Sequence, residues 1–203
     1  MQQRVFALIV CFLSICLFLL TLAFRQPVSA QEAQPGDFDL SALKGSGYVV
    51  LLRHAKTEGK DSEMIDLADC ATQRMLSPEG RAQVAELATR FRAAGVTQAR
   101  VLNSRWCRTQ ETAELLALGA ATAEPALTSP PMSQDPVAEM SGSFKAFLAD
   151  LKAPADGTPL VLVTHSTAFS VLQLTSPQQG GGLVLKLNGA AAPEVVGVIS
   201  PPQ

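Results

Sequence analysis

The run from Tyr48 to Leu52 constrains the fold of this chain more than any other stretch. It consists of aromatic, β-branched and aliphatic residues and ends at Arg53 and His54. An apolar run without polar alternation predicts a strand that is buried on both faces of a sheet. In open α/β sheets, ligands bind outside the carboxyl ends of the strands. We therefore expect Arg53 and His54 to face a pocket, although a solvated arginine and a capped surface histidine would give the same pattern.

The second of the two histidines in the chain has the same kind of position. Residues 159–164 form another short apolar run, and His165 follows it directly. Neighbouring parallel strands lie about 5 Å apart, or ~10 Å with one strand between them, so side chains at both strand ends can converge on one small anion. We expect His54 and His165 to share a site.

Strands and helices alternate after residue 48, which predicts an α/β fold with a mostly parallel sheet. Ser77-Pro78-Glu79 indicates the start of a helix, with Ser77 as its N-cap, and Gly95 indicates its end. The remaining predicted elements are a strand at 99–103, a helix at 110–119, an irregular segment at 120–136, a helix around 144–148, a strand at 159–164, a helix at 168–174, and strands at 183–187 and 195–199 joined through 188–189.

The first 47 residues differ from the rest of the chain. Residues 5–24 carry no charge and are almost entirely apolar, and small residues follow at 28–30. This pattern predicts a signal peptide at 1–30. An uncleaved anchor is the alternative, because about 20 apolar residues can cross a bilayer. Both imply export to the periplasm or another extracytoplasmic location, with an inner-membrane anchor in the second case. Residues 31–47 are predicted to be a linker with a short helix at 37–43, and 48–203 the domain.

Composition limits the partners of the domain. The 203 residues have a formal net charge of -2 and show no basic stripe. This argues against nucleic acid as a partner, so selectivity for an anion must come from a few placed arginines. Oligomeric state is left open by these features.

Cys70 and Cys107 are the only cysteines beyond the targeting segment. In an oxidising compartment two such thiols are expected to form a disulfide, with two buried free thiols as the alternative. The chain-entropy treatment gives an upper figure of about 4 kcal/mol for the stabilisation from a bridge with this spacing.

The arginines indicate the chemistry of the site. Arg108 lies near the start of the helix after the strand at 99–103, where backbone amides favour an anion. Guanidinium groups match phosphate oxygens, and a neutral imidazole is a competent nucleophile. The pattern predicts a site that takes a phosphoryl group onto a histidine without a metal or cofactor.

Three motifs, in this order, resemble the histidine phosphatase superfamily, the phosphoglycerate mutase-like group. They are Leu52-Arg53-His54-Ala55, the segment 104–114 around Arg108, and Val163-Thr164-His165. The resemblance spans about residues 48–174 and implies a three-layer α/β/α sandwich. Asp-Cys-Ala-Thr-Gln-Arg at 69–74 and Trp-Cys-Arg at 106–108 are similar to motifs of a small exported bacterial subgroup.

The resemblance implies roles for individual residues. His54 would be the nucleophile that becomes phosphohistidine. Arg53, Arg108 and His165 would hold the phosphoryl oxygens and stabilise the charge of the transition state. Thr57 would add a hydroxyl contact, or cap a turn instead.

Other charged residues are weaker candidates. Arg105 and Arg74 are each expected either to contact substrate or to pair with the acidic loop after residue 57. We also infer that a bridge between Cys70 and Cys107 would pin this loop against the turn that carries Arg108.

The general acid is the weak point of the resemblance. The acid phosphatase branch has an Asp directly after the second histidine, and this chain has Ser166. Mutases and their phosphatase relatives use a Glu after the second arginine, for which Glu139 is the candidate. Glu58, Asp61 and Glu63 are alternatives. Without a positioned acid, the site should favour good leaving groups such as aryl phosphates or phosphohistidine.

We therefore expect an exported phosphatase acting on a small-molecule or envelope phosphomonoester. A non-catalytic module that binds phosphate or phospholipid head groups is one alternative, and a phosphohistidine or protein phosphatase is another. A mutase would need a closed site, and the Cys-X5-Arg motif of cysteine phosphatases is absent. A metal site is the last choice, because the arginines would repel a cation.

Overall fold

The computed structural model describes residues 37–45, 47–152, 154–187 and 193–202. The predicted targeting segment and the connection at 188–189 lie outside these ranges. Contacts divide the chain into two units, Met1–Gln34 and Pro35–Gln203, and the description below concerns the second. None of the helices in the described ranges is long and apolar enough to span a bilayer.

A six-stranded sheet forms the centre of the fold, in the order β3-β2-β4-β1-β5-β6. The strands are β1 (Tyr48–Arg53), β2 (Arg100–Asn103), β3 (Ala121–Ala123), β4 (Leu160–Thr164), β5 (Gly182–Lys186) and β6 (Glu194–Ile199). The first four run parallel, while β5 pairs antiparallel with both β1 and β6. Because Arg53 lies opposite Thr164 in the β1–β4 pair, the next residue of each strand, His54 and His165, leaves the sheet at the same edge.

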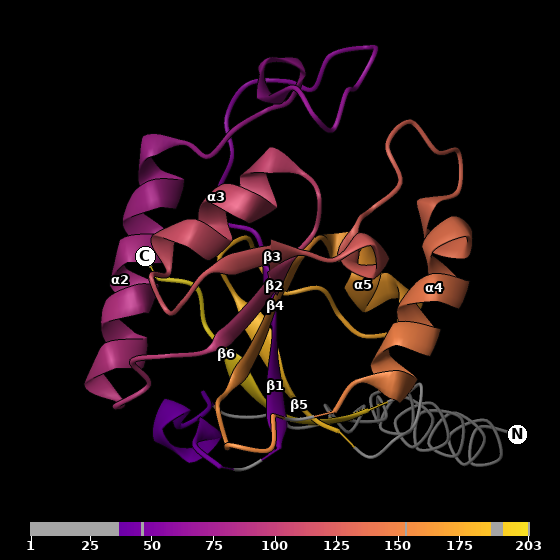
Figure 1. Ribbon diagram of the computed structural model, residues 1–203. Helices are drawn as coiled ribbons and strands as arrows, with labels where there is room; N and C mark the ends of the chain where they lie inside the picture. Colours follow the sequence, from indigo (N-terminus) through magenta and orange to yellow (C-terminus); the bar gives the residue numbers. More distant parts are fainter. Residues whose placement is uncertain (1–36, 46, 153, 188–192, 203) are drawn as a thin grey trace, which may run out of the picture. The chain divides into compact units, whose positions relative to one another are not determined.

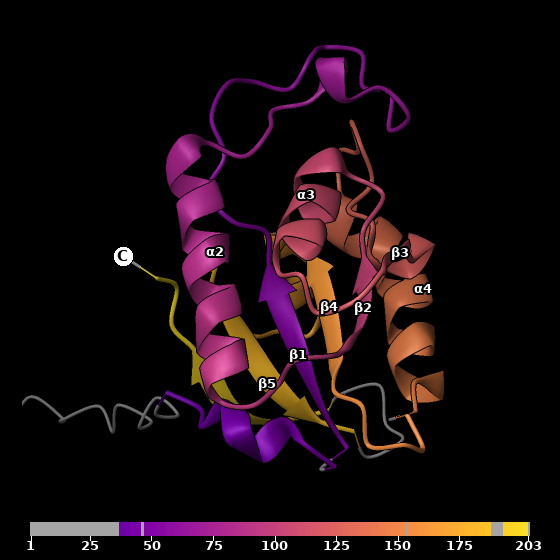
Figure 2. The ribbon, with the colours of Figure 1, turned by 60° about the vertical axis from the view of Figure 1, so that its left-hand side comes forward.

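Helices cover both faces of the sheet (Figures 1 and 2). On one face lie α2 (Pro78–Ala93) and α3 (Cys107–Leu115), and on the other α4 (Pro136–Asp150) and α5 (Ser166–Val171). Side chains of a strand point alternately to the two faces, so Val50 and Leu52 pack with the first pair of helices and Val49 and Leu51 with the second. The predicted three-layer α/β/α sandwich is confirmed.

The start of α2 follows its local sequence. The Ser77 side chain accepts a hydrogen bond from the Gly80 N–H, and Pro78 is the first helical residue. The buried face consists of Gly80, Val84, Leu87, Ala88 and Phe91. Gly95 follows the helix with a φ of 75°, a left-handed conformation that glycine adopts at little cost.

Two local predictions need correction. The helix α3 ends at Leu115, before the predicted end at residue 119, and the segment 120–136 contains β3 and the 3-10 helix η3 (Pro125–Leu127). Within residues 31–47, a short 3-10 helix, η1 (Leu40–Leu43), lies where a short helix is predicted and places Leu40 and Leu43 in the core. This part of the segment therefore packs as part of the domain.

Candidate active site

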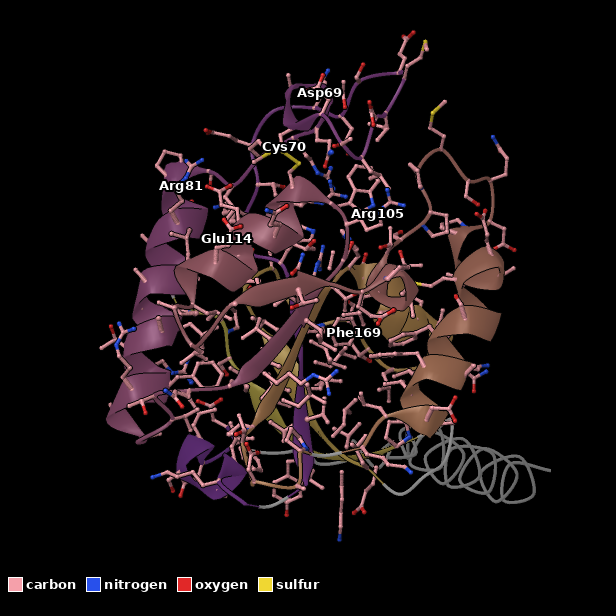
Figure 3. The ribbon with its side chains drawn as sticks, in the orientation of Figure 1. Asp69, Cys70, Arg81, Arg105, Glu114 and Phe169 are labelled. Carbon is pink, nitrogen blue, oxygen red and sulfur yellow. A yellow bond between two sulfur atoms is a disulfide. The ribbon has the colours of Figure 1, made fainter. Side chains whose placement is uncertain are left out.

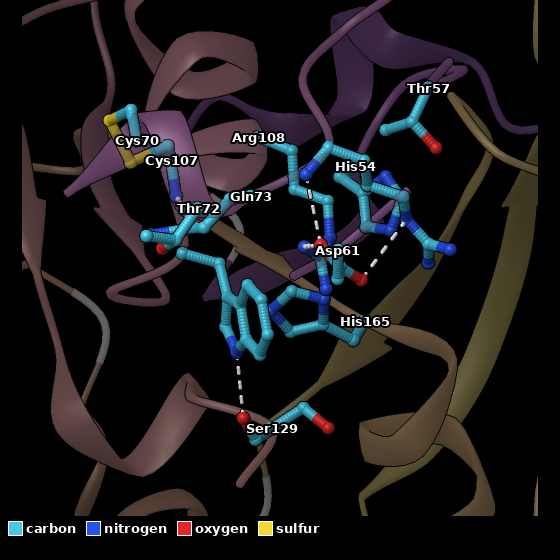
Figure 4. A network of polar contacts seen from close by, with 12 residues as sticks. His54, Thr57, Asp61, Cys70, Thr72, Gln73, Cys107, Arg108, Ser129 and His165 are labelled. Atoms are coloured by element: carbon cyan, nitrogen blue, oxygen red, sulfur yellow. Dashed lines mark hydrogen bonds and ion pairs between the residues drawn. A yellow bond between two sulfur atoms is a disulfide. The ribbon is translucent and has the colours of Figure 1, made fainter. Parts of the chain in front are cut away.

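The site lies at the carboxyl edge of the parallel strands. His54 follows β1, His165 follows β4, and Arg108 lies in the first turn of α3 after β2. Figure 4 shows these three side chains gathered around Asp61. Each of the three is buried, with 3% of His54, 4% of His165 and 5% of Arg108 exposed. Polar side chains with so little exposure need a structural or chemical reason, since burial without partners is costly.

The hydrogen bond of His54 fixes its tautomer. Its Nδ1 lies 2.8 Å from the carbonyl oxygen of Ala55. A carbonyl oxygen only accepts, so Nδ1 carries the proton and Nε2 keeps its lone pair. Burial lowers the pKa of His54 to about 3, and the neighbouring charges of Arg108, Arg53 and Arg74 add to this effect against the Ala55 hydrogen bond. His54 is therefore a neutral imidazole with a free nitrogen.

His165 lies next to His54, with 5.4 Å between the ring centroids. Its Nε2 is 2.8 Å from the hydroxyl oxygen of Ser104, and its ring lies 6.0 Å from that of Trp106. Burial is the main cause that lowers the pKa of His165 well below its usual value, followed by the charges of His54 and the arginines. Both histidines are thus uncharged in the absence of a ligand.

Arg108 is held by an aromatic ring and a carboxylate. Its guanidinium carbon lies 4.0 Å from the centroid of the Trp106 ring, a cation–π contact, and the Trp106 indole N–H donates to the Ser129 carbonyl. Its Nη1 is 3.4 Å from Asp61 Oδ1. Burial lowers the pKa of Arg108 to about 10, with Asp61 acting in the opposite direction. Arg108 therefore stays cationic at neutral pH.

Arg53 and Arg74 complete a group of three guanidiniums. Arg53 Nη1 donates to the Pro177 carbonyl at 2.9 Å. Asp61 Oδ1 accepts from the Arg74 backbone N–H at 2.9 Å, and its Oδ2 lies 3.7 Å from Arg74 Nε. The positive charge of Arg74 contributes to the lowered pKa of His54, His165, Arg53 and Arg108, so its field acts on all four groups.

The arginines present unused donors. In the described part of the chain, four buried side-chain polar atoms lack a hydrogen-bond partner, and three of them are the Nε atoms of Arg53, Arg74 and Arg108. The fourth is Asn103 Oδ1. Buried unpaired donors are costly, and an anion would satisfy them. Three guanidiniums and the Asp61 carboxylate sum to +2, which matches the dianion of a phosphomonoester.

The loop that carries Asp61 and Arg74 is attached to the start of α3. The predicted disulfide between Cys70 and Cys107 is present, with Cα atoms 5.7 Å apart (Figures 3 and 4). Gln73 Oε1 accepts from the Cys107 N–H at 2.9 Å, and Asp69 caps the short 3-10 helix η2 (Cys70–Thr72). The motif at 69–74 thus supplies the Asp69 cap of η2, the Cys70 half of the disulfide, the Gln73 hydrogen bond to Cys107, and Arg74.

The other candidates lie in different surroundings. The Thr57 hydroxyl accepts from Gln179 Nε2 at 3.3 Å. The Arg105 side chain is exposed, and its backbone N–H bonds Thr128. Glu139 is exposed on the first turn of α4, and within the described ranges it makes no hydrogen bond or ion pair to the histidines or arginines of the site.

Of the four acidic candidates, Asp61 is the one that reaches the site, while Glu58 and Glu63 are exposed. Asp61 forms ion pairs with two arginines, which suits it to hold them in place. Arg74 pairs with the acidic loop through Asp61, which is one of the two expectations for it. Sequence reasoning missed Trp106 and Ser104 as contacts of the site. The available signal for Arg74 and Trp106 was their place within the motifs at 69–74 and 106–108. The described residues include no group of three His, Cys, Asp or Glu side chains that could hold a metal ion.

A family model of the histidine phosphatase superfamily (branch 1) matches residues 49–128, which include His54 and Arg108. No curated protein matches the chain in sequence at a significant level.

Solved structures share the fold. The protein histidine phosphatase SixA, complexed with tungstate, has a TM-score of 0.54 at 18% identity, over 75% of this chain and 96% of that chain. A phosphoserine phosphatase from Entamoeba histolytica, in complex with 3-phosphoglyceric acid, has a TM-score of 0.57 at 16% identity, over the same shares, 75% and 96%. The family match over residues 49–128 agrees with the resemblance to the histidine phosphatase superfamily, and the solved structures show the same fold.

Proposed function

We propose that this chain, with the fold and first motifs of the histidine phosphatase superfamily, is a phosphatase that forms a phosphohistidine on His54. One observation carries the proposal: a neutral His54 with a free Nε2 lies among three guanidiniums whose Nε atoms lack hydrogen-bond partners. The phosphatases among the similar folds support the same class of reaction.

The reaction has two steps. His54 Nε2 attacks phosphorus, and the bond from phosphorus to the leaving oxygen breaks. Water then attacks the phosphohistidine, the P–N bond breaks, and inorganic phosphate leaves. Arg53, Arg74 and Arg108 would hold the phosphoryl oxygens in both steps, which is where charge stabilisation contributes most. His165 would hold one of these oxygens through a ring nitrogen.

Export is part of the proposal. The apolar segment at 5–24 and the small residues at 28–30 support a targeting signal, cleaved or retained as an anchor. The Cys70–Cys107 bridge fits an oxidising compartment. The natural substrate would be a small or envelope phosphomonoester, and the motifs at 69–74 and 106–108 support the small exported subgroup.

The test is hydrolysis of p-nitrophenyl phosphate by the purified chain with EDTA present. We expect the rate of hydrolysis to be unchanged by EDTA and to fall at least about 10³-fold in His54→Ala. Arg108→Gln should lose about 10²-fold or more, while Arg92→Gln, an exposed arginine on α2, should keep full activity.

The alternative is a module that binds phosphate without turnover. Phosphate binding by calorimetry together with no hydrolysis by the wild type would favour it. An acid-labile phosphoenzyme, trapped by rapid quenching of wild type and absent in His54→Ala, would exclude it.

A further inference from the structure

The loop at 58–75 depends on very few attachments. Most of its residues are exposed, including Met64 with 79% of its surface accessible. Its hydrogen bonds are largely internal, such as Ser62 N–H to the Thr72 carbonyl at 2.9 Å and Arg74 N–H to Asp61. Such a loop has little buried apolar surface to fix its position.

All polar and covalent links that we find from residues 59–74 to the rest of the described domain end on two residues. These links are the disulfide to Cys107, the hydrogen bond from Cys107 N–H to Gln73, and the ion pair between Asp61 and Arg108. The ion pair between Asp61 and Arg108 is long, at 3.4 Å, and the single hydrogen bond from Cys107 N–H to Gln73 contributes little by itself. The disulfide is therefore the strongest of the three links.

The two cysteines differ in surroundings. Cys107 is buried in the first turn of α3, one residue before Arg108, and Cys70 is exposed on the loop. Figure 3 shows Cys70 and Asp69 on the loop beyond α3. The bond thus joins a fixed point next to one phosphate-site arginine to a loop that carries another, Arg74.

We propose that the Cys70–Cys107 disulfide is a positioning bridge for the anion site: it holds Arg74 and Asp61 against Arg108, so that Arg74 is in place for the substrate phosphate. This inference rests on the proposed function, since it assigns a third guanidinium to the same phosphoryl group. Without the bridge, the loop moves away and the site keeps Arg53 and Arg108 alone.

A double-mutant cycle on phosphate affinity tests the proposal. Calorimetry with inorganic phosphate is applied to the full-length wild type, Cys70→Ser/Cys107→Ala, Arg74→Gln, and the triple variant. We expect the bridge variant and Arg74→Gln each to bind phosphate about tenfold or more weakly. Because the bridge acts through Arg74, the triple variant should match Arg74→Gln within about twofold.

Two results would overturn the proposal. One is unchanged phosphate affinity in the folded bridge variant. The other is a triple variant that binds phosphate more weakly than Arg74→Gln by the same factor that separates the bridge variant from wild type. That result would show that the bridge supports something other than Arg74. Met64→Ala, in the same loop but on its exposed side, is the matched control and should leave affinity unchanged.

Phosphate affinity is measured separately from folding and from turnover. Circular dichroism establishes whether each variant folds. If the bridge variant does not fold, the wild type is titrated with phosphate before and after dithiothreitol reduces the exposed disulfide, and an unchanged phosphate affinity in the folded, reduced protein would contradict the proposal. Phosphate binding needs no turnover, so a wild type that binds but does not hydrolyse refutes the proposed function and leaves this inference standing.

Discussion

The imidazole of His54 is the residue whose surroundings matter most. It is buried, donates through Nδ1 to the Ala55 carbonyl, and lies near three guanidiniums. All these features except the hydrogen bond to Ala55 disfavour a second proton. A neutral imidazole at this position is thus a property of the folded protein before any ligand binds.

This neutrality predicts how stability depends on pH. The folded pKa of His54 is about 3, below its ordinary value of 6.5. As pH falls below about 6.5, the unfolded chain gains this proton first, so stability present at pH 7 is lost progressively toward pH 3. Between pH 7 and 4.5, the free energy of unfolding should therefore fall by roughly 2–3 kcal/mol less in His54→Asn than in wild type. Urea unfolding in phosphate-free buffer measures this difference.

His165 remains in both proteins, and the main cause of its lowered pKa, burial, is the same in both, so the larger part of the difference between them reports on His54. Parallel curves of unfolding free energy against pH would contradict the neutral, buried state of this ring.

At the scale of elements, α2 lies so close to the segment after β1 that a side chain does not fit between them. A Cβ at Gly80 would clash with the backbone carbonyl of Lys56. We predict that Gly80→Ala destabilises the fold by about 1–3 kcal/mol, although alanine favours helices. Gly142 in α4 is the matched control, because a Cβ there meets nothing within 4 Å.

Gly142→Ala should stabilise the protein by about 0.5–1 kcal/mol, so the two substitutions should shift the urea midpoint in opposite directions. Stabilisation by both would show that α2 can move away from Lys56.

Elements with a strong local pattern could be predicted from sequence. The apolar runs of β1 and β4 and the Ser77 cap of α2 are local signals, and each appears where expected. Strand β3 has the sequence Ala-Thr-Ala and lies partly exposed at the sheet edge, so neither hydrophobicity nor alternation marks it. Its pairing with β2 is a tertiary effect.

The residues of the site likewise divide into those with a local sequence signal and those placed by long-range contacts. His54 and His165 were predictable because each ends a buried strand. Arg74 had only its place within the motif at 69–74 as a signal, because no local pattern distinguishes a solvated arginine from one held at the site by the disulfide and by the Gln73–Cys107 hydrogen bond. Long-range attachments of a loop are set by its partners, which local patterns do not encode.

At the scale of the whole molecule, the described residues of the site include more guanidiniums than carboxylates and no carboxylate that is free of an ion pair. In the described part of the chain, the carboxylate at the site is Asp61, which pairs with Arg74 and Arg108. General acid catalysis typically contributes 10²- to 10⁴-fold. We predict that kcat/KM for p-nitrophenyl phosphate exceeds that for an alkyl phosphate by at least about 10², measured under identical conditions.

Similar values for both substrates would mean that an acid is positioned during turnover. Asp61→Asn, Glu139→Gln and Glu58→Gln would then identify it, since loss of the acid should lower activity on the alkyl phosphate much more than on the aryl phosphate.

The disulfide also divides the chain topologically. The covalent ring closed by Cys70 and Cys107 contains all of α2 and β2, while His54 precedes it and His165 follows it. A protease that cuts once between residues 71 and 106 would leave both histidines in one covalent molecule. A single cut at 59–69, or one between residues 108 and 164, would instead separate them, which makes the exposed loop at 58–75 one of the places where a single nick disconnects the two histidines.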